Sequence, residues 1–397
     1  MDKIEILFGS KNECCGCGLC ASVCPINIIK MIPDEEGFIY PQVIEKSECI
    51  HCRKCINICP LKHLTTNNNV INKYFAGSFV SNQETISCAS GGIATAISRE
   101  FVKNHGVVYG AKYSNQFKGV KYSRASLVAE LEEFKTSKYV QSDKENLYEN
   151  IKLDIDNEIP ILFIGLPCEV AAVKTRFGAY ENLYVVDLIC HGPTSQEVHS
   201  QYCSYLESKY GCKITSFSTR YKKNGMWKPF FIRAKFENGK EFCEEFHKSD
   251  YGAAFRYLKR PSCYKCQIKN DKFMGDLTIG DYHYVERGMK AFNPHGVSVA
   301  IPRSEKGMKL IASIKDTFRL ENIGKRGAMA NRAMREPIPE PAKRKEFQSV
   351  FIKYGLKKAG RLYFVRFTNV QRGIKSVIFK YGIKVKRIVI SSSSADK

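Results

Sequence analysis

The sequence lacks several features that would assign it to a common class. No uncharged apolar run approaches the roughly 18 residues that a membrane span needs. Neither the Gly-x-Gly-x-x-Gly pattern nor the Gly-x4-Gly-Lys-[Ser/Thr] pattern occurs, so a standard dinucleotide fold and a nucleotide hydrolase are both unsupported. Residues 1–10 lack the basic-then-apolar pattern of a secretory signal, and we therefore expect a cytoplasmic protein.

Acidic residues are also scarce, with 40 of them against 62 lysines and arginines, for a net charge of +22. Such an excess invites a nucleic-acid interpretation, but residues 343–387 alone hold 14 lysines and arginines and one acid. The charge is thus a property of a C-terminal tail, and a nucleic-acid partner is disfavoured. The tail mixes basic and apolar residues at near-helical spacing, which predicts either peripheral contact with the inner face of the membrane or a helix docked on protein. The residues concerned are Lys353, Lys357, Lys358, Arg361, Phe351, Ile352, Leu356 and Leu362.

Cysteine, by contrast, is abundant, and eight of the 17 cysteines fall in two runs of the same pattern. Each run has the spacing Cys-x2-Cys-x2-Cys-x3-Cys-Pro, and the second begins 35 residues after the first. This is the spacing of a bacterial ferredoxin with two 4Fe-4S clusters, in which the fourth cysteine of each run ligates the other run's cluster. Zinc, the alternative, needs four ligands in two separated pairs. We expect one cluster on Cys14, Cys17, Cys20 and Cys59, a second on Cys24, Cys49, Cys52 and Cys55, and a spare thiol at Cys15.

The odd number of cysteines, in a chain with cluster motifs, argues against a disulfide scaffold and for a reducing compartment, with oxygen sensitivity. The length allows two or three domains, and the polar segment 65–69 has the composition of a linker. We predict an α+β ferredoxin-like module at 1–65, a linker at 66–75, an α/β domain at 76–340 and the basic tail at 341–397.

The α/β assignment rests on a strand, a helix and a strand predicted at 159–165, 169–177 and 183–189. The short loops between them make this a βαβ unit with parallel strands. Because parallel strands place their carboxyl ends on one edge, where α/β proteins bind ligands, we expect Cys168 and Cys190 to share that edge.

Glycines mark two further local structures. Asn238-Gly239 predicts a β-hairpin that joins 230–236 to 241–246. Ser90-Gly91-Gly92 precedes an apolar-periodic helix at 93–103, and a glycine-rich helix start leaves backbone N–H groups free to bind phosphate. An ordinary capped helix is the alternative at this position.

Six short blocks occur in order within roughly residues 1–340 and are specific in combination: Ser90-Gly91-Gly92, Ser137-Lys138-Tyr139-Val140-Gln141-Ser142, Gly165-Leu166-Pro167-Cys168-Glu169, Asp187-Leu188-Ile189-Cys190-His191-Gly192, Arg260-Pro261-Ser262-Cys263-Tyr264-Lys265-Cys266 and Gly280-Asp281. With the cysteine runs, they resemble the beta subunit of coenzyme F-420 (deazaflavin)-reducing hydrogenase and its dehydrogenase relatives, preceded by a ferredoxin domain. The resemblance implies that the α/β domain binds FAD and exchanges electrons with iron–sulfur clusters. Many bacterial relatives look like accessory proteins of surface-polysaccharide biosynthesis.

The resemblance also implies which residues contact the flavin: Ser90, Gly91, Gly92, Ser137, Lys138, Tyr139, Ser142 and Asp281. His191 and His283 are candidate proton donors because imidazole titrates near neutrality, and Lys138 is a third catalytic candidate. Structural histidines and a solvated lysine are the alternatives.

A third 4Fe-4S cluster is predicted on Cys168, Cys190, Cys263 and Cys266. The first two cysteines end parallel strands on one edge of the sheet. The last two form a Cys-x2-Cys pair in a loop and need two further soft ligands. Zinc on the same four residues is the main alternative.

The leading functional hypothesis is an iron–sulfur flavoprotein oxidoreductase. A flavin can join one-electron carriers to a two-electron substrate, whose identity the residues do not specify. The expected partner is an external electron donor or acceptor, namely a ferredoxin, a flavodoxin or a hydrogenase-type protein. The alternative is a non-catalytic electron-transfer subunit that delivers electrons to a partner enzyme.

Overall fold

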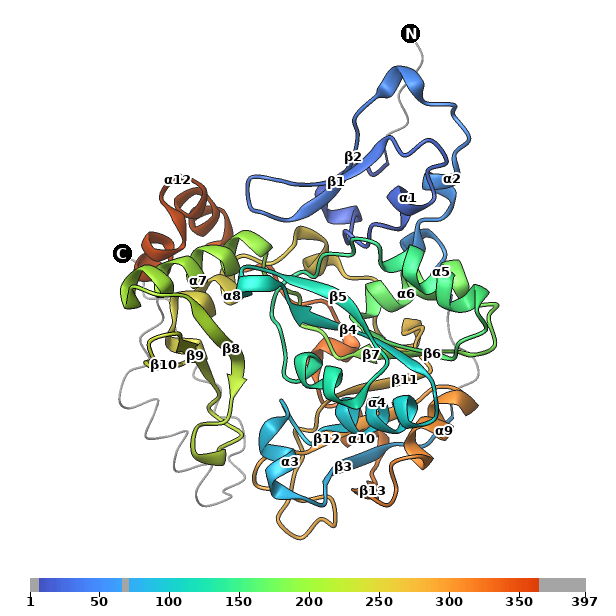
Figure 1. Ribbon diagram of the computed structural model, residues 1–397, viewed down its shortest axis with the longest axis vertical. Coiled ribbons are helices and arrows are strands. Elements are labelled where there is room, and N and C mark those ends of the chain that lie inside the picture. The colour runs from blue at the N-terminus through green and yellow to red at the C-terminus, as the bar shows by residue number, and fades with distance from the viewer. Residues whose placement is uncertain (1–6, 66–70, 364–397) are drawn as a thin grey trace, which may run out of the picture.

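The computed structural model describes residues 7–65 and 71–363, and its N-terminal module stands at one end of a larger body (Figure 1). In the module, strands β1 (Ile29–Pro33) and β2 (Ile39–Val43) pair in antiparallel fashion. The short helices α1 (Leu19–Ser22) and α2 (Lys54–Asn57) each lie within one cysteine run. The module has little apolar core of its own, so docking on the body and bound metal have to contribute to its stability.

The body is built on an eight-stranded mixed sheet with the strand order β13-β3-β12-β11-β7-β6-β4-β5. Four central strands, β11, β7, β6 and β4, run parallel, and the strands toward both edges pair in antiparallel fashion. The predicted α/β class is therefore confirmed. The strand bounds are β3 (Phe75–Phe79), β4 (Val107–Tyr113), β5 (Val120–Ala125), β6 (Ile161–Gly165), β7 (Leu183–Leu188), β11 (Leu277–Asp281), β12 (Ser298–Pro302) and β13 (Phe318–Asn322).

Helices cover both faces of this sheet, as the alternation of buried side chains along the strands requires. Ile161 and Phe163 of β6 pack on the side of α5 (Leu147–Asp156) and α6 (Pro167–Phe177). Leu162 packs on the opposite side, toward α4 (Ile93–Lys103) and α9 (Glu305–Ala312). Each such fully buried side chain stabilises the fold by roughly 1.5–3 kcal/mol. The predicted βαβ unit is β6-α6-β7, with its two strands parallel.

A smaller antiparallel sheet lies beside the main one and contains β8 (Ile214–Tyr221), β9 (Phe231–Phe236) and β10 (Glu241–Glu245). The hairpin predicted at Asn238-Gly239 is the β9–β10 connection. Helices α7 (Gln196–Tyr210), α8 (Asp250–Tyr257) and α12 (Arg344–Tyr363) pack with this sheet around a shared aromatic core (Figure 1). The short helices α3 (Asn82–Ser87), α10 (Lys325–Ala328) and α11 (Arg332–Arg335) complete the body.

The described part of the basic tail is the helix α12, and it docks on the protein. Phe351 and Leu356 are buried in the core shared with α7 and α8. Lys357 forms an ion pair of 3.4 Å with Asp250. The remainder of the predicted tail, residues 364–397, lies outside the described residues, so membrane contact stays a prediction. Over the described ranges, no helix combines the length and apolarity of a bilayer span.

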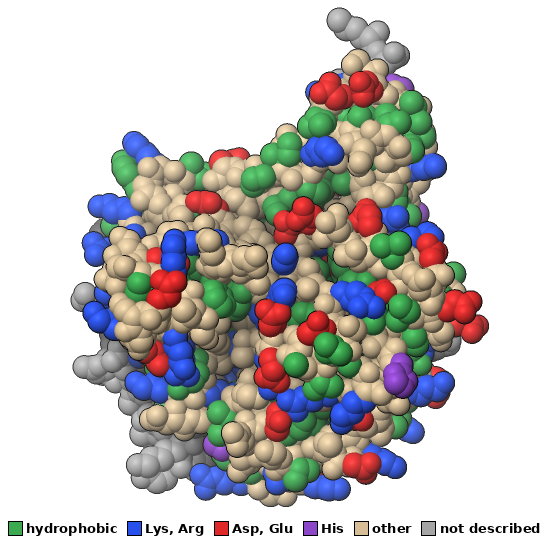
Figure 2. All heavy atoms as spheres, in the orientation of Figure 1, with side chains coloured by type: hydrophobic (Ala, Val, Ile, Leu, Met, Phe, Trp, Pro, Cys, Tyr) green, Lys and Arg blue, Asp and Glu red, His purple; other side chains and the backbone are tan. Residues whose placement is uncertain are grey.

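The surface in Figure 2 bears on the predicted partners. Lysines and arginines are interspersed with acidic side chains across this face and do not gather into one basic patch. A nucleic-acid platform requires such a patch with exposed aromatics. The division of the chain at residues 65, 75 and 340 stays a prediction.

A buried ion pair fastens the module to the body. Glu36, in the turn between β1 and β2, accepts hydrogen bonds from Arg344 Nη2 at 2.6 Å and Gln348 Nε2 at 2.7 Å. The side chains of Glu36 and Arg344 are 1% and 6% exposed, so this contact is shielded from solvent. Burial raises the pKa of Glu36 to about 7, although the Arg344 guanidinium opposes the shift. The module is thus held by the first turn of α12, a segment more than 300 residues away in the chain.

Replacing Arg344 by methionine should destabilise the protein by about 3–5 kcal/mol, because it leaves Glu36 buried without its counter-charge. The measurement is denaturant unfolding followed through the visible absorbance of the clusters. Lys345→Met, an exposed position on the same helix, is the matched control and should change stability by less than about 0.5 kcal/mol. Adding Glu36→Gln to Arg344→Met should recover part of the loss. Equal stability of the Arg344 and Lys345 variants would contradict this account of docking.

Candidate functional site

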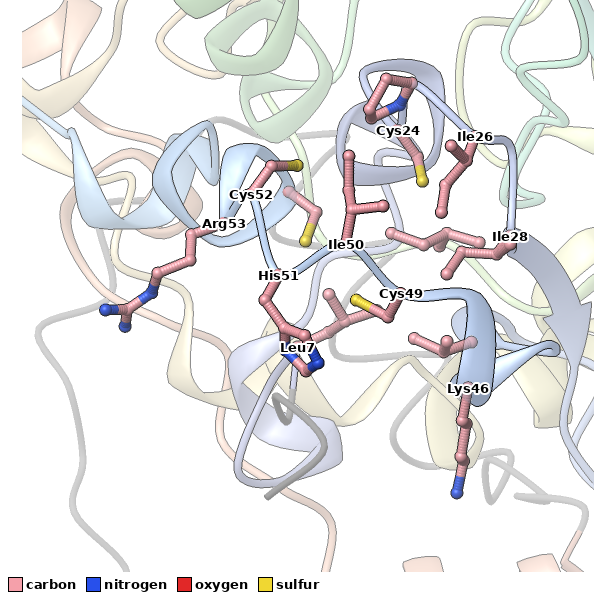
Figure 3. A pocket seen from close by; sticks show the side chains of 14 residues that line it. Leu7, Cys24, Ile26, Ile28, Lys46, Cys49, Ile50, His51, Cys52 and Arg53 are labelled. Atoms are coloured by element: carbon pink, nitrogen blue, oxygen red, sulfur yellow. The ribbon is translucent and has the colours of Figure 1, made fainter. Parts of the chain in front are cut away.

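The cysteines of the predicted outer cluster surround one apolar pocket in the module. Cys24, Cys49, Cys52 and Cys55 all line it, together with apolar side chains such as Ile50. Figure 3 shows the sulfur atoms of Cys24 and Cys49 turned toward the same space beside Ile50. Burial raises the pKa of Cys55, and the nearby Cys24 and Cys52 thiols add to this effect. Four soft sulfur donors in an apolar pocket suit an iron–sulfur cluster.

The predicted inner set, Cys14, Cys17, Cys20 and Cys59, lies against the body. Tyr148 Oη on α5 donates a hydrogen bond to the Cys17 carbonyl at 2.7 Å. Burial raises the pKa of Cys20 to about 12, with smaller contributions from the neighbouring Cys14, Cys55 and Cys59 thiols. Cys20 therefore adjoins members of both predicted sets, and the inner set lies between the outer set and the body.

The spacing of the thiols bears on the zinc alternative. In residues 7–65 and 71–363, the only three potential ligand atoms that lie within 4.8 Å of one another belong to Asp34, Glu35 and Glu36. Thiolates around a tetrahedral zinc lie roughly 3.8 Å apart, given Zn–S bonds of about 2.3 Å. A four-iron cluster binds each thiolate at a different iron and so spreads them further.

The four cysteines of the predicted third cluster meet at the carboxyl edge of the parallel strands. Cys168 is in the first turn of α6, Cys190 follows β7, and Cys263 and Cys266 lie in and just after the short helix Pro261–Lys265. Burial raises the pKa of Cys190 to about 11, with a further contribution from Cys266. Burial also raises the pKa of Cys263, which lies near both Cys190 and Cys266. Cys168 lies near Cys190.

Cys15 has a specific place that the sequence did not indicate. Its buried thiol lies near those of Cys168 and Cys17, and their influence lowers its pKa well below the usual value despite burial. Cys15 therefore lies between the inner ferredoxin set and the predicted third set. Because only its neighbour Cys14 fits the ferredoxin register, spacing alone gave no signal for this role.

Two buried cations, also missed by the sequence reasoning, lie beside the cysteines. The Arg260 side chain reaches Cys14, and Lys259 lies near Cys263 and Cys190. Burial lowers the pKa of Lys259 to about 8, an effect that those two thiols oppose. Within the described ranges, neither cation forms an ion pair with a carboxylate. A buried charge without a counter-charge is unfavourable, so the sulfur sites are the natural place for compensating negative charge.

The glycine-rich block predicted to bind flavin phosphate is partly engaged by the protein. Ser90 Oγ donates to the Val297 carbonyl at 2.8 Å, and Gly91 N donates to Ser298 Oγ at 2.9 Å. Gly92 adopts φ 98°, a left-handed conformation that favours glycine, and begins α4 without a side-chain cap. The first-turn N–H groups of an α-helix have no partner within the helix. The start of α4 thus keeps the anion-binding character that its glycines predicted, whereas Ser90 and Gly91 have structural partners.

The second block, residues 137–142, lies between the two sheets. Lys138 Nζ donates to the carbonyls of Glu133 and Lys135, both at 2.8 Å, and burial lowers its pKa to about 7. The Ser137 carbonyl accepts a bond from Thr219 Oγ1 at 2.6 Å, and the Ser142 carbonyl accepts one from Lys144 Nζ at 2.6 Å. These contacts hold the block in place through its backbone. The Lys138 ammonium is bound to two carbonyl oxygens.

Arg220 on β8 joins the predicted flavin residues to one another. Its guanidinium donates to Tyr139 Oη at 3.0 Å and to the Ala89 carbonyl at 2.8 Å, and it pairs with Asp281 at 3.0 Å. Burial alone would raise the pKa of Asp281, but Arg220 outweighs it and the pKa is lowered. Among the described residues, neither the buried Nε atom of Arg220 nor the buried indole Nε1 of Trp227 has a hydrogen-bond partner. Arg220 thus brings one unpaired donor to the point where the three predicted flavin blocks meet.

The two predicted proton donors lie near one another. His283 Nδ1 is 3.3 Å from Lys228 Nζ, and burial together with that cation lowers the pKa of His283. His191 keeps an exposed edge, yet the surrounding protein and the nearby Lys259 and Lys269 cations lower its pKa as well. Both imidazoles are therefore neutral near pH 7, and His191 directly follows Cys190 of the predicted third set.

Comparison with known proteins agrees with this geometry. Residues 13–63 match the 4Fe-4S dicluster domain, which includes all eight cysteines of the two runs. Residues 160–325 match the family described as the C terminus of the coenzyme F420 hydrogenase/dehydrogenase beta subunit. The chain is thus related to this beta subunit over residues 160–325. It joins the family's C-terminal domain to an N-terminal dicluster domain, which makes it an iron–sulfur electron-transfer protein.

One solved structure similar to this chain is the xenon-derivatised F420-reducing [NiFe] hydrogenase complex from Methanosarcina barkeri. The sequences are 15% identical, and the match covers 74% of this chain and 91% of the other, with a TM-score of 0.45. A search of the curated proteins gives no significant match.

Proposed function

We propose that this protein is an iron–sulfur flavoprotein oxidoreductase. Electrons pass between the two ferredoxin clusters, a third 4Fe-4S cluster and FAD, which exchanges two electrons with a substrate. The observation that carries the proposal is the continuous series of thiols from the module into the body, through Cys17, Cys15, Cys168 and Cys190. Such a series has a function only if the redox centres at its two ends exchange electrons.

The ferredoxin clusters are assigned to the sets that the spacing predicted. Their ligands are Cys14, Cys17, Cys20 and Cys59 for the inner cluster and Cys24, Cys49, Cys52 and Cys55 for the outer one. The outer pocket is the natural docking point for an external ferredoxin, flavodoxin or hydrogenase-type partner. Exposed Ile26, Ile44 and Ile50 surround that end of the module and supply apolar contact area.

The third cluster is assigned to Cys168, Cys190, Cys263 and Cys266. Lys259 supports the assignment, because this buried cation lies beside Cys263 and Cys190 and has no carboxylate partner in the described ranges. Four thiolates around an iron–sulfur core carry net negative charge and compensate it.

FAD would lie between the two sheets, and its chemistry is the conversion between one-electron and two-electron transfer. Its pyrophosphate would occupy the start of α4 at Gly92. Arg220 offers an unpaired buried N–H group to its polar edge. Tyr139 and Asp281 position Arg220. Lys138 supports the site through its two carbonyl contacts, and a catalytic role would require it to leave them.

His191 and His283 are the residues that would exchange a proton with the substrate. Their lowered pKa values keep an imidazole nitrogen available as a proton acceptor at neutral pH. The substrate belongs to a two-electron reaction that the residues do not specify. We place the protein in the cytoplasm and, from the resemblance to bacterial relatives, in a supporting role in surface-polysaccharide biosynthesis.

A relay without flavin is the second candidate. It is favoured by the protein contacts that already engage Ser90, Gly91 and Lys138. In that case the chain would deliver electrons to a partner enzyme and would have no substrate of its own.

Flavin binding separates these two candidates. Anaerobically purified protein should release about one FAD per chain on denaturation. Arg220→Met should weaken FAD binding by roughly 10- to 150-fold, because a buried charged donor is lost. Arg233→Met, which removes an arginine that pairs with Glu241 on the outer hairpin, is the control and should leave binding unchanged. Absence of flavin after supplementation would favour the relay.

Metal content tests the third cluster. The full-length protein should contain roughly 12 iron atoms and no zinc, and Cys263→Ala should retain roughly eight. Cys212→Ala is the matched control, since this thiol bonds to the Tyr210 carbonyl and packs beside the aromatic core of the smaller sheet, and it should keep all the iron. Roughly eight irons with one zinc in the wild type would show that the same four cysteines bind zinc.

A further inference from the structure

Arg260 is among the largest fully buried side chains of the protein. It precedes the short helix that carries Cys263, but its guanidinium points away from the body and into the module. Nε donates to the Cys14 carbonyl at 2.7 Å, and Nη2 lies 3.8 Å from Cys14 Sγ. One arginine of the body thus binds both the backbone and the sulfur of the first cysteine in the ferredoxin module.

The surroundings fix this guanidinium in place. Nη1 donates to Gln141 Oε1 at 3.0 Å, and the Tyr40 ring lies 3.9 Å from Arg260 Cζ. A Cβ atom at Gly16 would come within 2.7 Å of Arg260 Cζ, so the module backbone fits closely around the side chain. Because Gly16 also has φ 69°, glycine is favoured there both by space and by conformation.

Among the described residues, the charge of Arg260 has no acidic partner. Over residues 7–65 and 71–363, the ion pairs that arginines form with carboxylates do not include Arg260. A fully buried cation needs compensating negative charge. The group in contact with it is the Cys14 sulfur, a predicted ligand of the inner cluster.

We propose that Arg260 raises the reduction potential of the inner ferredoxin cluster above that of the outer one. Adding an electron makes a thiolate-ligated cluster more negative, so a buried cation and an N–H···S contact stabilise the reduced form more than the oxidised form. The outer cluster, on Cys24, Cys49, Cys52 and Cys55, has no counterpart to Arg260 among its pocket residues that comes from the body. The inference deepens the proposed function and rests on its assignment of Cys14 to the inner cluster.

The proposed difference in reduction potential would give electron transfer between the two ferredoxin clusters a preferred direction. An electron that enters at the outer pocket finds a more favourable site at the inner cluster, next to Cys15 and the body. The same arginine joins module and body, so this favourable site exists only in the docked arrangement. Electrons would then be held at the inner cluster, from which they can pass to the third cluster.

The test is a potentiometric titration of the anaerobic full-length protein, with the reduced clusters observed by electron paramagnetic resonance. Arg260→Lys keeps the positive charge but removes the planar guanidinium group with its several N–H donors. Arg260→Gln removes both the charge and the guanidinium. The potential of one ferredoxin cluster should fall in Arg260→Lys and fall further in Arg260→Gln, while the other ferredoxin cluster is unchanged. Arg344→Lys, a buried arginine at the same interface that contacts no cysteine, should leave both potentials unchanged.

Unshifted potentials in Arg260→Lys and Arg260→Gln, with full iron content, would overturn the proposal, as would equal shifts of both ferredoxin clusters. Loss of the inner cluster from both variants would also overturn it, because Arg260 would then be needed for assembly and not for tuning. The flavin content of the same samples is measured separately. A shifted potential in a protein without FAD would support the inference and refute the proposed flavin chemistry.

Discussion

Compensation of buried charge at the junction of module and body is the constraint on which the rest of the structure depends. The adjacent residues Lys259 and Arg260 carry positive charge into the interior toward two different cysteine sets. Glu36 and Arg344 form an ion pair at the same junction. An uncompensated buried charge costs several kcal/mol, so the module is stable in this position only when the charges are matched. Docking and metal binding are therefore coupled.

The topology of the body determines where the proposed electron path would end. Parallel strands β6, β7 and β11 bring their carboxyl ends to one edge, and the residues that follow them include Cys168, Cys190 and His283. The module docks on α5 and α6, which places Cys17 and Cys15 next to Cys168. The smaller sheet then contributes Arg220 on the far side of the predicted flavin site. Each element would supply one step of the proposed path.

Short-range patterns in the sequence were sufficient to predict the cysteine runs, the β6-α6-β7 unit and the β9–β10 hairpin. Residue spacing and hydrophobic periodicity determine each of these features locally. They did not reveal the partners of Arg260 and Arg344, which lie 246 and 308 positions away in the chain. Nor did they reveal Cys15, whose role comes from the docking of Cys168. The docked position of α12 depends likewise on its contact with Asp250, and near-helical spacing alone left two alternatives open.

The central claim is that electrons can pass without interruption from the module to a two-electron centre in the body. A reductive titration of the anaerobic full-length protein with a one-electron donor measures this most directly. The account predicts an uptake of about five electrons per chain, one for each of three clusters and two for FAD, with bleaching of the flavin absorbance. An uptake that stops at about two electrons, with no flavin change, would contradict it.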